Sequence, residues 1–155
     1  MKHWLWYVLA IAVLSMLGFA PFQGTDVAKL KPVEVIRVST DRGSMFVETD
    51  TGDIGVGMDA ASAFADLKEK ASGDIFLETA DFILVDPMLA GKISEFSTFL
   101  RPACSVCLEF GDADIEAVAD FLTAHKPELT LQDIAAGAGS VPALVVQEGR
   151  MRLVQ

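Results

Sequence analysis

The apolar positions of the chain follow two different periods, and the changes between them predict an order of strands and helices. Short runs with strand-like composition cover residues 33–38, 45–49 and 54–56. The first two runs are separated by Asp41-Arg42-Gly43 and the last two by Asp50-Thr51-Gly52-Asp53, which are both turn compositions. We therefore expect a hairpin followed by a short return strand.

A helical period begins next and then alternates with strand-like runs. Residues 60–71 repeat apolar positions at helical spacing behind Asp59, a good N-cap, and before Gly73. Residues 75–77 and 82–85 suit strands, and Asp86-Pro87 predicts the start of a second helix. That helix carries an apolar stripe and is stopped by Pro102; the stripe consists of Leu89, Ile93, Phe96 and Leu100.

The last third of the chain continues the alternation. Residues 105–110 predict a strand, Gly111-Asp112 a turn with a helix cap, and residues 115–125 a third helix that ends in His125, Lys126 and Pro127. Thr130 caps a short helical turn through Ile134, and residues 136–140 form a loop. A final hairpin is predicted from residues 143–146 and 151–154 around Glu148-Gly149.

Strands that alternate with helices in the middle and pair as hairpins at both ends predict a mixed sheet with packed helices. The fold class is therefore α/β, with α+β as the alternative, and about three helices. The length after the N-terminal segment suits one domain, which we place at residues 33–155.

The N-terminal segment has a different character, because residues 4–22 contain no charged side chain. As a helix these residues rise about 28 Å, close to the hydrocarbon thickness of a bilayer. We predict a membrane-spanning signal anchor at residues 1–23 and a tether at residues 24–32. Lys2 favours a cytoplasmic N-terminus with the domain outside, at the cell membrane. Cleavage after Ala20, which would make the protein secreted, is the alternative, although Pro21 disfavours it.

The net charge of the predicted extracytoplasmic part limits the classes of partner that it can bind. Without Lys2 the chain has 11 basic and 22 acidic residues, a net charge of −11. This net negative charge repels phosphate groups, so nucleic acid is not an expected partner.

Cys104 and Cys107 are the only cysteines, and their C-x-x-C spacing is shared by thiol oxidoreductases and metal knuckles. In a strand, residues three apart point to opposite faces with Cα atoms about 10 Å apart, whereas a disulfide needs less than about 7 Å. We therefore expect two structural cysteines. The alternative is a membrane-anchored thioredoxin-like oxidoreductase that uses both cysteines, with Pro142 as the cis-proline of the facing strand. A zinc site would need two more ligands, of which only His125 is evident.

Other motifs favour plain structural roles. Asp50-Thr51-Gly52 matches the aspartic-protease triplet, but it lies inside a turn composition without apolar neighbours. The acids around it lack the spacing of a calcium loop, and the glycine-rich loop at residues 136–140 lacks the lysine of a phosphate loop. His125 is expected to cap a helix. No catalytic residue, cofactor or metal is predicted, and whether the chain is an enzyme is left open, with a non-enzyme favoured.

Three segments resemble one family. GDIGVGMDAASAFADLKEKASGDIFLETADFILV, LAGKISEFSTFLRPACSVCLEFGDADIEAVADFL and VPALVVQEGRMRLVQ are similar to the N-terminal domain of spore-germinant-receptor C subunits, the GerC type. The shared features are a glycine before a helix, an I-x-E-F-like helix with a following arginine, and a closing strand pair.

The resemblance implies a non-catalytic, membrane-tethered domain that assembles with other membrane proteins on the outer face of the membrane. The chain departs from the family because those subunits are lipoproteins with further domains, whereas its first cysteine is Cys104. We expect an envelope protein with a protein partner, in which a germination-like role depends on the resemblance alone.

Overall fold

The computed structural model describes residues 30–154, so the predicted membrane anchor at residues 1–23 lies outside the described part of the chain. Among residues 30–154, no helix has both the length and the apolar composition needed to cross a membrane.

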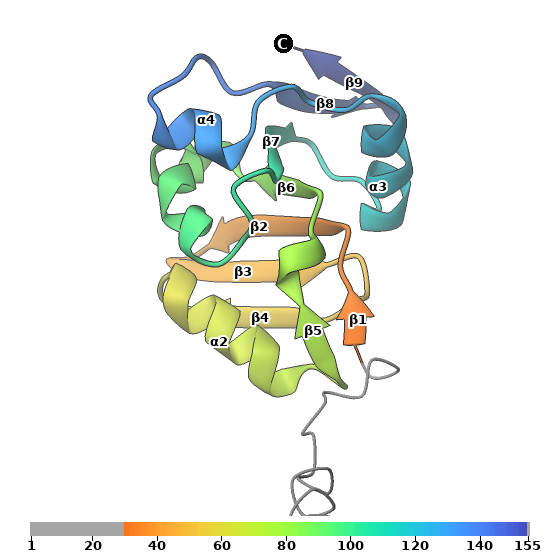
Figure 1. Ribbon diagram of the computed structural model, residues 1–155. Helices are drawn as coiled ribbons and strands as arrows, with labels where there is room; N and C mark the ends of the chain where they lie inside the picture. The colour runs from red at the N-terminus through yellow and green to blue at the C-terminus, as the bar shows by residue number, and fades with distance from the viewer. Residues whose placement is uncertain (1–29, 155) are drawn as a thin grey trace, which may run out of the picture.

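A seven-stranded sheet forms the centre of the molecule (Figure 1). Its spatial order is β4-β3-β2-β6-β7-β8-β9, with β2, β6, β7 and β8 parallel and with antiparallel strands at both ends. This arrangement confirms the predicted α/β class with a mixed sheet. The strands are β2 (Val35–Asp41), β3 (Ser44–Thr49), β4 (Ile54–Gly57), β6 (Phe82–Val85), β7 (Ser105–Phe110), β8 (Ala143–Gln147) and β9 (Arg150–Val154).

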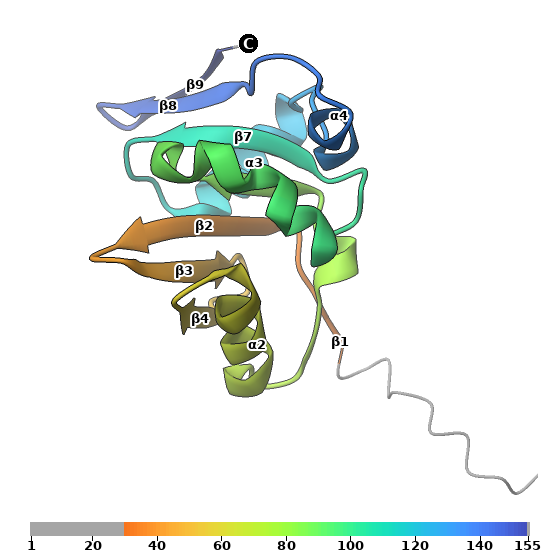
Figure 2. The same ribbon diagram turned by 90° about the vertical axis from the view of Figure 1, so that its left-hand side faces the viewer.

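Helices cover the two faces of the sheet unequally (Figure 2). One face, which we call the three-helix face, packs against α2 (Ala60–Lys70), the 3₁₀ helix η3 (Pro87–Thr98) and α4 (Leu131–Ala135). The other, which we call the α3 face, packs within residues 30–154 against a single helix, α3 (Ile115–Ala124). The buried side chains accordingly form two clusters, one on each side of the sheet.

The end of the predicted tether is part of the fold. Residues 30–32 form β1 (Leu30–Pro32), which pairs in parallel with β5 (Asp74–Phe76) as a separate two-stranded sheet. The last three residues of the predicted tether are therefore in a strand. Strand β5 continues into a short 3₁₀ helix, η2 (Leu77–Thr79), whose Leu77 is buried in the main core.

Polar caps define where two of the helices begin, as the sequence predicts. The Asp59 side chain accepts a hydrogen bond from the Ser62 N–H at 2.8 Å, while the Ser62 hydroxyl accepts from the Asp59 N–H. Thr130 and Asp133 make the same reciprocal pair at α4. Each box supplies acceptors for helix N–H groups that have no partner within the helix.

The second predicted helix differs in type. Its inner side consists of Leu89, Ile93 and Phe96, as the apolar stripe predicts, but the backbone is a 3₁₀ helix over Pro87–Thr98. The stripe identifies the side that faces the sheet, and it does not distinguish three residues per turn from 3.6.

Glycine in β4 allows α2 to lie unusually close to the sheet. A Cβ atom on Gly55 would lie 2.3 Å from the Ala63 carbonyl oxygen and 2.6 Å from the Leu67 Cβ. Neither atom belongs to the far end of a flexible side chain, so the helix itself would have to move.

The substitution Gly55→Ala is therefore expected to lower the free energy of unfolding by about 1–3 kcal/mol, the usual cost of overpacking. Chemical denaturation measures this loss. The control is Gly91→Ala in η3, where an added Cβ meets no atom within 4 Å, and we expect no loss there. Equal stability of the two variants would contradict the close packing of α2 on β4.

Candidate functional site

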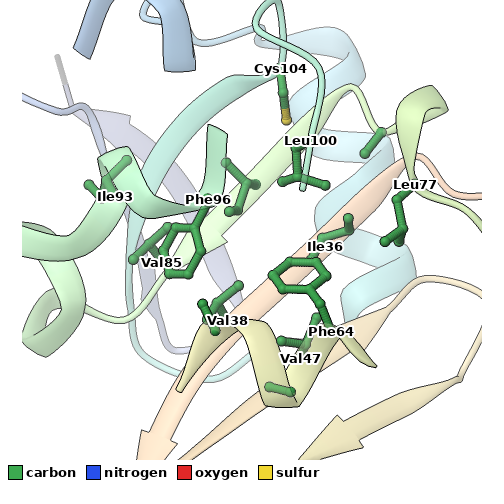
Figure 3. Close-up of a cluster of buried hydrophobic side chains, with 14 of the residues drawn as sticks. Ile36, Val38, Val47, Phe64, Leu77, Val85, Ile93, Phe96, Leu100 and Cys104 are labelled. Atoms are coloured by element: carbon green, nitrogen blue, oxygen red, sulfur yellow. The ribbon is translucent and has the colours of Figure 1, made fainter. Parts of the chain in front are cut away.

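The two cysteines lie on opposite sides of the sheet. Cys107 is inside β7 and packs into the cluster of the α3 face, whereas Cys104, just before β7, packs into the cluster of the three-helix face. Figure 3 shows the Cys104 side chain beside Leu100. Both thiols are free and buried. The predicted strand at residues 105–110 is confirmed, and with it the separation of the two side chains.

Burial also suppresses the chemistry of both thiols. Loss of hydration raises the pKa of Cys104 and of Cys107 to about 12, because a buried thiolate has no water to stabilise its charge. Pro142 does not face the cysteines through a cis bond, since no peptide bond within residues 30–154 is cis. Its carbonyl instead accepts a hydrogen bond from the Leu108 N–H at 2.8 Å, as part of the β7–β8 pairing. The arrangement gives no support to the oxidoreductase alternative.

His125 is the C-cap of α3, in agreement with the sequence. Its Nδ1 lies 3.1 Å from the carbonyl oxygen of Phe121, and its ring stacks on the Phe121 ring with centroids 4.5 Å apart. The part of the chain that the structure describes brings no three His, Cys, Asp or Glu side chains into a metal-binding group. His125 and the two cysteines are thus separate features.

The D-T-G triplet is a turn, as predicted. The hydroxyls of Thr49 and Thr51 lie 2.8 Å apart, Thr51 donates to the Asp53 carboxylate at 3.0 Å, and Asp50 accepts from the Glu34 N–H at 3.0 Å. These hydrogen bonds use the carboxylates to hold the β3–β4 connection. The predicted loop at residues 136–140 is likewise present between α4 and β8.

The α3 face carries an arginine network that is absent from the sequence-based predictions. Arg37 in β2 binds both carboxylate oxygens of Glu109 in β7, at 2.7 and 2.9 Å, and donates to Glu48 at 3.1 Å and to the Ala113 carbonyl. The side chains of Arg37 and Glu109 are only 14% and 8% exposed. A charged residue between the apolar residues Ile36 and Val38 was the available signal.

The network has opposing effects on its two main members. Desolvation lowers the pKa of Arg37, but hydrogen bonds and charge attraction from Glu109 and Glu48 outweigh it, so the pKa is raised. Burial raises the pKa of Glu109, and the guanidinium opposes that shift. The pair therefore joins two strands at the expense of removing both charges from water.

A hollow of about 450 Å³ adjoins this network at the carboxyl ends of the parallel strands, where α/β folds often bind ligands. Its charged groups are largely engaged already. Glu109 and Glu48 bind Arg37, and Asp86 caps η3 by accepting from the Met88 N–H at 2.8 Å. The hollow therefore offers few free donors or acceptors to a small molecule.

The β8–β9 hairpin offers a different kind of surface. On the three-helix face its turn end extends beyond α4, and no helix in the described part of the chain covers it (Figure 2). A hollow of about 790 Å³ lies there, lined by both apolar and charged side chains, and Phe110 and Val154 beside it are each 44% exposed. The lining residues are Val145, Gln147, Glu148, Arg150, Arg152 and Val154. We call this surface the hairpin surface.

Comparison with known proteins adds no relative. The chain matches no protein-family model, no curated protein and no solved structure.

Proposed function

We propose that this chain is a membrane-anchored, non-catalytic domain that assembles with a protein partner at the cell envelope. The anchor at residues 1–23 rests on the uncharged segment of the sequence, which is long enough to span a bilayer. The domain then lies outside the cytoplasm because of Lys2. The resemblance to germinant-receptor C subunits supports a partner that is itself a membrane protein.

The hairpin surface is the observation that carries the proposal. Its exposed apolar side chains, Phe110 and Val154, lie next to Arg150 and Arg152. Within residues 30–154 neither arginine makes an ion pair, although acidic residues outnumber basic ones by 22 to 12 in the chain. Exposed apolar side chains with a polar rim that includes arginine are typical of protein interfaces.

Site-specific photocrosslinking in intact cells tests this assignment. A photoreactive amino acid at Gln147, on the hairpin surface, is expected to form a discrete adduct with one membrane protein. The same group at Glu116, on the exposed side of α3, serves as the control and should form none. Arg152→Glu reverses a charge on the surface and should reduce the Gln147 adduct at least tenfold. An adduct of equal yield from both positions, or none from either, would exclude the hairpin surface.

A further inference from the structure

The outer edge of β9, which is unpaired within residues 30–154, indicates a mode of binding for the partner protein. We infer that an extended acidic segment of the partner protein adds to the sheet as a strand beside β9, with its carboxylates on Arg150 and Arg152. The inference rests on the proposed function and specifies the chemistry of the same surface.

The hairpin geometry determines which backbone groups are available for an added strand. Glu148 and Gly149 both have positive φ, 50° and 73°, as in the two-residue turns that favour hairpins. Arg150 pairs with Gln147 across this turn, and Arg152 with Val145. Because hydrogen-bonded and non-hydrogen-bonded pairs alternate from such a turn, the N–H and C=O groups of Met151 and Leu153 point away from β8. They form the outer edge of the sheet.

At the opposite edge of the sheet, the protein itself supplies a partner for an outward backbone group. In β4 the outward Val56 N–H donates to the Asp66 carboxylate of α2 at 2.8 Å. Within residues 30–154, β9 has no such partner, and it pairs only with β8. Free edges of this kind are the templates used in β-strand addition.

The side chains of β9 indicate the composition of the added strand. Arg150 and Arg152 point to the three-helix face beside Val154, where the hollow lies, while Met151 and Leu153 pack partly against the α3 cluster. An added strand would place alternate residues opposite each set. Carboxylates on one side and apolar side chains on the other match both.

Charge complementarity distinguishes this partner from a second copy of the chain. The antiparallel register with full overlap would pair Met151 with Leu153 of the second copy and would therefore set Arg152 opposite Arg152. Like charges in directly opposed positions destabilise a sheet. A membrane surface is also disfavoured, because β9 and the start of β1 lie at opposite ends of the molecule (Figure 1).

A designed peptide provides the direct test on the full-length protein in detergent micelles. The probe has seven residues, with glutamate alternating with valine and isoleucine, and the control peptide has lysine in place of each glutamate. We expect the glutamate peptide to bind at least tenfold more tightly, and more weakly as salt increases. Equal affinities, or no binding, would overturn the inference.

Residue-resolved amide exchange reports the mode of binding. In the free protein the Met151 and Leu153 amides should exchange rapidly, while those of Arg150 and Arg152 are protected by β8. The glutamate peptide should slow exchange at Met151 and Leu153 at least tenfold. Binding without this protection would contradict strand addition, and protection that grows with protein concentration alone would indicate a second copy instead.

One pair of variants isolates the backbone contribution. Met151→Pro removes the outward N–H, whereas Met151→Ala shortens the side chain and keeps that N–H. We expect the proline variant to bind the peptide at least tenfold more weakly than the alanine variant. If the two variants bind equally, strand addition is wrong.

The same variants separate the inference from the proposed function in cells. Loss of the Gln147 adduct with Met151→Pro, and its retention with Met151→Ala, would support both. Retention with Met151→Pro combined with loss in Arg152→Glu would leave the assembly function standing and overturn strand addition.

Discussion

Alkylation of Cys104 and Cys107 in the folded protein at pH 8 is expected to be about a thousandfold slower than alkylation of an exposed cysteine. The thiolate is the reacting species, and burial raises the pKa of each thiol from 9.0 to about 12. At pH 8 this shift alone reduces the thiolate fraction about a thousandfold. Mass spectrometry after timed exposure to iodoacetamide measures the rate at each site.

The denatured protein is the control for this experiment, because both thiols should then react at ordinary rates. A single cysteine that reacts at the ordinary rate in the folded state would contradict the burial and would restore the oxidoreductase alternative.

The dependence of the free energy of unfolding on pH gives a second measurement. Since the folded pKa values are raised, the stability that the protonated thiols provide is complete below pH 9 and is lost as the pH rises towards 12.

Arg37→Ala is expected to lower the free energy of unfolding by about 3 kcal/mol, at the lower end of the range for breaking a buried ion pair. The loss arises because Glu109 is left buried without its cation. Removing the guanidinium also raises the pKa of Glu109 further. The deficit should therefore be greater at pH 8 than at pH 5, because a lower pH favours protonation of Glu109, which removes the unpaired charge.

The double variant Arg37→Ala with Glu109→Gln serves as the control, because it removes both charges. It should be more stable than Arg37→Ala alone at pH 8, and its deficit should vary less with pH. Urea denaturation at both pH values provides the comparison. A deficit in Arg37→Ala that does not depend on pH would show that lost packing, rather than the unpaired carboxylate, accounts for the effect.

The strands and caps of the fold were predictable because their signals are local. The turn residues Arg42 and Gly43 join β2 to β3, and the hairpin around Glu148-Gly149 lies where the sequence places it. Asp59 and Thr130 cap the helices predicted from them. Each of these features depends on residues close together in the chain.

Features that depend on tertiary contacts were less predictable. Strand β1 has only three residues and forms because β5 lies beside it, a pairing across more than forty positions. The type of η3 is not encoded in its apolar stripe. Residues 30–32 are too few to show a periodic pattern of their own, and the sequence therefore predicts them as part of the tether.

The candidate site shows the same division. The two-residue period of a strand was enough to predict that the two cysteine side chains lie on opposite sides of the sheet. The pairing of Arg37 with Glu109 links positions 72 residues apart, so it could not be derived without the sheet order. The hairpin surface depends on the position of β9 at the sheet edge, with its arginine side left uncovered by the helices that the structure describes.

Because Cys104 and Cys107 lie on opposite sides of the sheet, their labelling rates can measure the local opening of each side separately. Each sulfur is buried beneath a different helical layer. The slow residual labelling of Cys104 therefore measures how often the layer of α2, η3 and α4 opens. The labelling of Cys107 measures how often α3 opens. Matching rates at the two positions would mean that both layers detach in one cooperative event. Unequal rates would rank the layers by local stability without any introduced probe.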